Sequence, residues 1–207
     1  MALLVVLNAA LLGVAALVAL RTGIIPGQGE HLVEIEQSAF AYREEPTDIV
    51  LETTPATGET YVLYTNYACP YCAEVHAAFA TARADATSSL PQPNVVRLHF
   101  LDGNGGRFAT QELVSAYMLR LWREDQTKFY SLENELFEQQ DDWVTLNETA
   151  LLVWLNERAG LGWTADDIAA ERKELLDAQA NSPEDLTEVP SLYSDGKLHS
   201  GLVYALV

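Results

Sequence analysis

The chain has 207 residues with 12 basic and 30 acidic side chains, which gives a formal charge of −18 at pH 7. Such a negative surface repels phosphate groups, so we expect no nucleic acid partner. Apolar residues make up 49% of the chain, enough to form the core of one domain of ordinary size.

Residues 2–20 are apolar apart from Asn8. This length is close to the roughly 20 residues that a helix needs to cross a bilayer. We therefore expect a membrane anchor or a signal segment over residues 1–21, with membrane contact through residues 2–20. The anchor is favoured because no basic residue precedes Arg21 and no A-x-A-like cleavage site stands near Leu20.

The next part of the chain, residues 22–45, has Pro and Gly early and mixed charge after them, which is typical of a tether. We place the folded domain at residues 46–207. Its first short strand is predicted at 49–51. Residues 61–67 are rich in β-formers without a breaker and predict a buried strand.

This strand leads directly into Ala68-Cys69-Pro70-Tyr71-Cys72. Residues 72–84 are alanine-rich and amphipathic, which predicts a helix. Residues 95–101 predict a second strong strand.

The middle of the chain, at about residues 107–180, changes to helical spacing of apolar residues. It predicts about four helices, the third of which stops at Gly160 and the fourth of which opens with a capping box from Thr164 to Asp167. The predicted helices are 108–123, 128–140, 148–159 and 165–179.

A hairpin follows the helical block. Two short β-like runs, Val189–Tyr193 and Lys197–His199, flank Asp195-Gly196, and Asp-Gly between such runs is a hairpin signal. The predicted order is therefore strand, helix, strand, helical block and hairpin, a mixed α/β fold.

The two cysteines of the chain, Cys69 and Cys72, stand three positions apart between a predicted strand and a predicted helix. This arrangement is typical of a thioredoxin-like dithiol. A zinc site needs about four ligands, and His76 is the only histidine nearby, so we predict no metal and no other cofactor. His76 itself, one turn after Cys72, could influence the dithiol, but we expect it to be a solvated helix residue.

The helix start assigns a role to each thiol. Cys69 lies at the helix N-terminus, where free N–H groups and the helix dipole favour a thiolate, so we assign it as the attacking and more exposed thiol. Pro70 suits the first helical position. Cys72 is the resolving thiol, which breaks a mixed disulfide with the substrate. A purely structural disulfide is the alternative, disfavoured by the short strained ring.

Pro190 stands at the head of the hairpin, after Val189. It could serve as an ordinary edge-strand proline. Its spacing alone does not separate that role from a functional one.

Several of these segments together resemble the DsbA-like branch of the thioredoxin superfamily. The resemblance covers about residues 46–200 and implies a thioredoxin fold with a helical subdomain inserted between the central strands and the C-terminal hairpin. It is carried by Tyr64 through Cys72, Lys128 through Trp143, Thr187-Glu188-Val189-Pro190 and Asp195-Gly196-Lys197.

The resemblance also implies a site and a setting. It implies that Val189–Pro190 is cis and faces the dithiol, where the preceding backbone can pair with an extended peptide. With Pro70 and Tyr71 between the cysteines, these four residues are the candidate substrate contacts. The setting implied is extracytoplasmic, on the periplasmic or cell-surface side. The implied partners are exported cysteine-containing proteins and a membrane redox partner, either quinone-linked or an electron donor.

Two features depart from that family. Tyr71 stands where the family's best-known oxidant has histidine, and it cannot add a positive charge, so we expect a less extreme oxidant. Residues 201–207 leave under two turns for the closing C-terminal helix of the family, so we expect that helix to be degenerate or cut short.

Three functions remain open from the sequence. The leading hypothesis is an oxidase that donates a disulfide to exported proteins. A reductase or isomerase would use the same dithiol in the other direction. A peptide-binding, chaperone-like module would use the Pro190 region without turnover.

Overall fold

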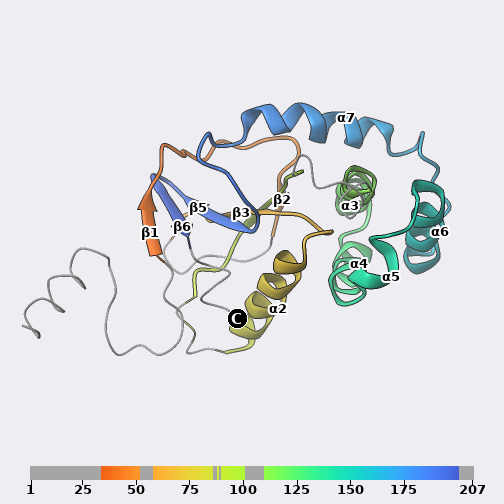
Figure 1. Cartoon of the computed structure of the whole chain (residues 1–207), viewed down its shortest axis with the longest axis horizontal. Helices are drawn as coiled ribbons and strands as arrows, with labels where there is room; N and C mark the ends of the chain where they lie inside the picture. The colour runs from red at the N-terminus through yellow and green to blue at the C-terminus, as the bar shows by residue number, and fades with distance from the viewer. Residues whose placement is uncertain (1–33, 52–57, 86–87, 89, 101–109, 201–207) are drawn as a thin grey trace, which may run out of the picture.

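The computed structural model describes residues 34–51, 58–85, 88, 90–100 and 110–200 (Figure 1). The predicted anchor or signal segment, the first part of the predicted tether and the C-terminal residues 201–207 lie outside the described residues. Within the described ranges, no helix combines the length and the apolar character needed to cross a membrane.

The described strands form one six-stranded sheet in the order β1-β6-β5-β3-β4-β2. β3 is central, between the parallel β4 and the antiparallel β5. All four residues of β3 are buried, as expected for an uninterrupted run of β-formers covered on both faces. The strands are β1 (Glu34–Gln37), β2 (Ile49–Val50), β3 (Val62–Thr65), β4 (Val95–Leu98), β5 (Ser191–Ser194) and β6 (Lys197–Ser200).

β1 was not predicted from the sequence, because it lies in the segment interpreted as a tether. It pairs antiparallel with β6 along its whole length and forms one edge of the sheet. The described sheet therefore begins at Glu34 and not near residue 46. Polar and charged residues at three of its four positions hide the strand from a hydrophobic pattern.

The helices fall into one crossover helix and one inserted block. α2 joins β3 to β4, and the block stands between β4 and β5, as predicted. Figure 1 shows α3 to α6 gathered beside the sheet and α7 running back toward it. α3 packs against α4, α6 and α7. The helices are α2 (Pro70–Ala84), α3 (Gln111–Glu124), α4 (Gln126–Glu138), α5 (Gln140–Trp143), α6 (Glu148–Ala159) and α7 (Ala169–Ala178), followed by the 3-10 turn η1 (Gln179–Asn181).

The predicted start of the last helix was wrong by about four residues. The capping box does form: the carboxylate of Asp167 accepts hydrogen bonds from the backbone N–H and the hydroxyl of Thr164, each at 2.7 Å. The backbone N–H of Asp167 also donates to the Thr164 carbonyl at 3.2 Å. These bonds close a turn, and the helix begins only at Ala169.

Glycine ends one helix and turns the hairpin, as predicted. Gly160 follows α6 with a φ of +60°, the left-handed conformation common after a helix C-terminus. Gly196 has a φ of +72° in the turn between β5 and β6, where Ser194 is paired with Lys197.

A buried arginine joins the segment before β2 to the sheet. Arg97 on β4 forms an ion pair with Asp48 at 2.6 Å and another with Glu45 at 3.1 Å. Its guanidinium also donates to the hydroxyl of Tyr64 at 3.0 Å and to the carbonyl of Arg43 at 2.5 Å. The charge is thus paired and its donors are used, as a buried cation requires.

The helical block is connected to the sheet at the end of β4. The side-chain N–H group of Gln179 donates to the Leu98 carbonyl at 3.2 Å, and its carbonyl accepts from the N–H of Phe100 at 2.9 Å. These bonds fix the C-terminal end of α7 next to the strand that is parallel to β3.

We predict that Asp125→Ala lowers the free energy of unfolding by about 1 kcal/mol. The Asp125 carboxylate caps α4 by accepting from the N–H of Lys128 at 3.0 Å. Urea unfolding followed by circular dichroism measures the loss. Glu157→Ala on the exposed face of α6 is the control, with an expected change within about 0.5 kcal/mol. Equal effects of the two substitutions would contradict the assigned cap.

Candidate active site

The two cysteines lie at the start of α2, directly after the central strand. Cys69 is the N-cap residue, with extended backbone angles (φ −86°, ψ 122°), and Pro70 is the first helical residue. The first turn of α2 contains no acidic side chain. The positive end of the helix dipole therefore acts on Cys69 without a local carboxylate to offset it. Both cysteines are free thiols in this structure.

The thiols are buried, and the residues between them are not. Cys69 is 3% exposed and Cys72 is 1% exposed, so Cys69 is the more accessible of the two by a small margin only. Pro70 is exposed and Tyr71 is 56% exposed. A substrate approaching the dithiol would thus meet Pro70 and Tyr71 first.

Val189 and Pro190 lie against the first thiol. The Val189–Pro190 peptide bond is cis, and the Cys69 thiol donates to the Val189 carbonyl at 3.6 Å. Both Val189 and Pro190 are buried. Pro190 precedes β5, which lies between β3 and β6, so it is not a proline of an edge strand. The structure brings all four predicted substrate contacts to the dithiol, two exposed and two buried.

Burial and the neighbouring thiol raise the pKa of Cys72. The largest cause is burial, which removes this sulfur from water. The hydrogen bond with Cys69 and the negative charge of the Cys69 thiolate raise the pKa further. The Thr65 side chain and the backbone N–H of Asn66, at 3.4 Å from the sulfur, act in the opposite direction. Cys72 is thus a thiol whose anion the surroundings disfavour, as suits a resolving thiol.

Asn66 holds the loop that carries Cys69, and sequence reasoning missed it. Its amide nitrogen donates to the carbonyl of His99 at 2.9 Å and to the side-chain oxygen of Gln111. Its side-chain oxygen accepts from the N–H of Ala68 at 2.9 Å, and its backbone carbonyl accepts from the N–H of Cys69 at 3.1 Å. The loop is therefore attached to the end of β4 and to the start of α3.

Gln140 on α5 holds the same loop from the other side. Its buried side-chain nitrogen donates to the carbonyl of Tyr67 at 2.6 Å and to the carbonyl of Cys69 at 2.8 Å. In the sequence, Gln140 was included only within the segment that resembles the family's helical insertion and was given no role. A buried amide inside a helical apolar pattern is the only signal that could have found it.

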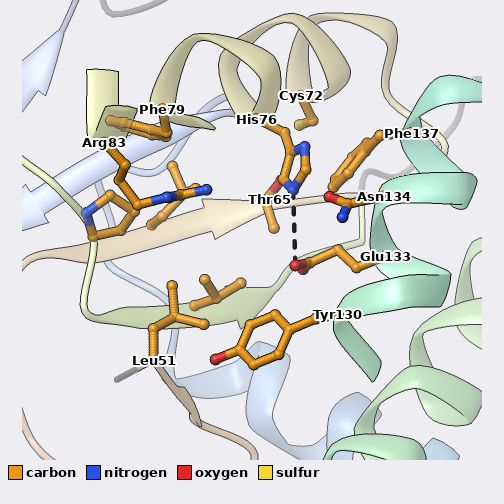
Figure 2. A pocket seen from close by; sticks show the side chains of 13 residues that line it. Leu51, Thr65, Cys72, His76, Phe79, Arg83, Tyr130, Glu133, Asn134 and Phe137 are labelled. Carbon is orange, nitrogen blue, oxygen red and sulfur yellow. Dashed lines mark ion pairs between the residues drawn. The ribbon is translucent and has the colours of Figure 1, made fainter. Parts of the chain in front are cut away.

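A pocket of about 350 Å³ lies next to Cys72, between α2, α4 and the sheet (Figure 2). His76 and Glu133 face each other across it, with Nε2 and Oε2 3.7 Å apart. His76 also stacks on Phe137, with ring centroids 4.5 Å apart, and its side chain is 20% exposed. The expectation that His76 is a solvated helix residue was therefore wrong, because α4 of the insertion covers it.

Among the described residues, no group of three or more His, Cys, Asp or Glu side chains could hold a metal ion. The arrangement can instead support thiol chemistry. A nucleophilic sulfur at a helix start, a second sulfur one turn away and a backbone carbonyl beside the first are the parts that disulfide exchange needs.

No family model matches the sequence, and no curated protein matches it. Comparison of the fold with solved structures does find matches. BdbD from Bacillus subtilis, in its oxidised form, superposes with a TM-score of 0.58 at 16% identity, covering 81% of this chain and 92% of BdbD. The MdbA protein from Corynebacterium diphtheriae, a thiol-disulfide oxidoreductase, has a TM-score of 0.49 at 16% identity, covering 84% of this chain and 87% of MdbA.

The disulfide oxidoreductase DsbA from Proteus mirabilis has a TM-score of 0.47 at 14% identity, covering 88% of this chain and 93% of that protein. The fold assignment rests on BdbD, whose likeness extends over most of both chains. The strand order and the position of the helical block between β4 and β5 agree with it. This chain has a DsbA-like thioredoxin fold with an inserted helical block, as the sequence predicts.

Proposed function

We propose that the chain is a protein disulfide oxidoreductase that exchanges a Cys69–Cys72 disulfide with cysteine-containing proteins. One observation carries the proposal. Cys69 caps α2 next to the carbonyl that precedes a cis proline, with Cys72 three residues later. The cap position favours a reactive sulfur, and the carbonyl is positioned for backbone pairing with a substrate peptide.

The proposed exchange needs no cofactor. A substrate thiolate attacks the Cys69 sulfur of the oxidised protein, the Cys69–Cys72 bond breaks, and Cys72 leaves with the electron pair. A second substrate thiolate then attacks the substrate sulfur of the mixed disulfide. The substrate disulfide forms, Cys69 leaves as a thiolate, and the protein has gained the two electrons that the substrate has lost.

The site supports the disulfide-donating direction. The N-terminus of α2 stabilises the Cys69 thiolate, and stabilisation of the reduced form makes a disulfide more oxidising. The neutral Tyr71 adds no positive charge, so the proposed oxidant is a moderate one. A reductase or isomerase would use the same residues and differ in reduction potential.

The setting of this activity is part of the proposal. A chain that donates disulfides works outside the reducing cytoplasm, so we place it on the periplasmic or cell-surface side. Its proposed substrates are exported cysteine-containing proteins, and a membrane redox partner, quinone-linked in the oxidase case, would reoxidise the dithiol. The apolar residues 2–20 would attach it to the membrane.

We predict that the two thiols ionise in different pH ranges. Cys72→Ser leaves only Cys69, and Cys69→Ser leaves only Cys72, so each thiolate can be followed alone by its ultraviolet absorbance. Because burial raises the pKa of Cys72, its thiolate should appear at a higher pH than that of Cys69. Coinciding titration curves, or the reverse order, would contradict the assigned roles.

We also predict that Cys69→Ser reduces disulfide transfer to the uncatalysed rate while the folded state persists. Oxidised full-length protein is mixed with a reduced, unfolded cysteine-containing substrate, and substrate thiols are counted by alkylation. Glu138→Gln, an exposed change on α4, is the control and should transfer at the wild-type rate. Wild-type protein that binds the substrate without oxidising it would overturn the proposal in favour of a peptide-binding module.

A further inference from the structure

The fate of the Cys72 proton is not explained by the dithiol alone. Cys72 must gain a proton after it leaves the disulfide, or lose one before it attacks. Its side chain is 1% exposed and lines the pocket of about 350 Å³ shown in Figure 2. The groups that face this pocket are therefore the ones that can exchange a proton with it.

Four ionisable side chains besides Cys72 line the pocket: His76 and Arg83 from α2, and Tyr130 and Glu133 from α4. A guanidinium does not release its proton in proteins, and a phenol ordinarily does so only near pH 10. Of these four kinds of side chain, an imidazole is the one that ordinarily both takes and gives a proton near neutral pH, which leaves His76, with the carboxylate of Glu133 beside it.

His76 lies on the same helix as Cys72, four residues later. Residues four apart in a helix lie on the same face, one turn from each other. Figure 2 shows the His76 ring below Cys72, between Thr65 and Phe137. The stack on Phe137 restricts the orientation of the ring, so that it remains in the pocket.

Glu133 is held so that it faces His76. Its Oε1 accepts from the hydroxyl of Tyr67 at 3.3 Å, while its Oε2 lies 3.7 Å from the His76 ring. Tyr67 is fully buried, and its carbonyl is bound by Gln140. A carboxylate in this position orients the imidazole.

We propose that His76 exchanges the proton of Cys72 and that Glu133 is the positioning residue for His76. This inference rests on the proposed disulfide exchange and adds a proton-transfer pair to it. The pair comes from two parts of the fold, the crossover helix α2 and the inserted helix α4.

The proton follows the electron pair in both directions. When a substrate thiolate attacks Cys69, the disulfide breaks, the electron pair remains on Cys72, and protonated His76 gives its proton to that sulfur. In the reverse step, neutral His76 accepts the Cys72 proton. The Cys72 thiolate then attacks Cys69 in the mixed disulfide, the Cys69–Cys72 bond forms, and the substrate sulfur leaves with the electron pair and is protonated by water.

The test follows the reverse step in a single turnover. Reduced full-length protein is mixed with excess oxidised glutathione, quenched with acid and alkylated, and the mixed disulfide on Cys69 is quantified over time and pH. His76→Gln should slow the closing of the Cys69–Cys72 disulfide by about 100-fold, so that the mixed disulfide accumulates.

Three further variants separate proton exchange from packing. Glu133→Gln should slow the closing step less than His76→Gln, because the ring remains stacked on Phe137 and loses only the carboxylate that orients it. Glu138→Gln, on the exposed face of the same helix, should change nothing. His76→Ala should regain rate when imidazole is added, which a merely structural role would not produce.

The outcomes also separate this inference from the proposed function. A wild-type protein that forms no mixed disulfide and no internal disulfide removes both. If the wild type closes its disulfide and His76→Gln closes it equally fast, the function stands and the proton-transfer role is overturned. If His76→Gln does not fold, an unchanged closing rate in Glu133→Gln and the absence of imidazole rescue in His76→Ala overturn the role instead. In proteins that carry Cys72→Ser, the mixed disulfide on Cys69 should form at the same rate with His76 as with His76→Gln.

Discussion

The chemistry proposed for this chain depends on the hydrogen bonds that fix the short loop between β3 and α2. The side chain of Asn66, which begins the loop, accepts from the N–H of Ala68. Gln140 on α5 donates to the carbonyls of Tyr67 and Cys69. The Val189 carbonyl contacts the Cys69 sulfur from the third side. The helix dipole stabilises a thiolate at the N-cap only while the sulfur remains there, so these hydrogen bonds are what hold Cys69, the proposed nucleophile, in position.

The helical insertion supplies much of that fixation. Gln111 at the start of α3 binds Asn66, Gln140 on α5 binds the loop carbonyls, and Phe137 on α4 covers His76. The block is itself connected to the sheet, because Gln179, directly after α7, binds the carbonyl of Leu98 at the end of β4. The insertion is therefore part of the site, because α4 lines the pocket next to Cys72.

The sequence predicted the elements with strong local signals and missed those made by distant partners. The buried run of β3, the Cys-Pro-Tyr-Cys start of α2 and the Asp195-Gly196 turn each encode their structure locally. β1 carries polar residues and becomes a strand only because β6 is beside it. Asn66 and Gln140 act through bonds to residues far away in the chain, which no periodicity reports. His76 looked solvated because nothing in α2 indicates that α4 covers it.

The proposed chemistry requires that Cys69 and Cys72 form a reversible, functional disulfide. Equilibration of the full-length protein in glutathione buffers, read by alkylation of both thiols, tests it most directly. We expect one two-electron transition between about −120 mV and about −270 mV, nearer the first value for a disulfide donor. A protein that forms no internal disulfide, or one that stays oxidised below about −300 mV as structural disulfides do, would contradict it.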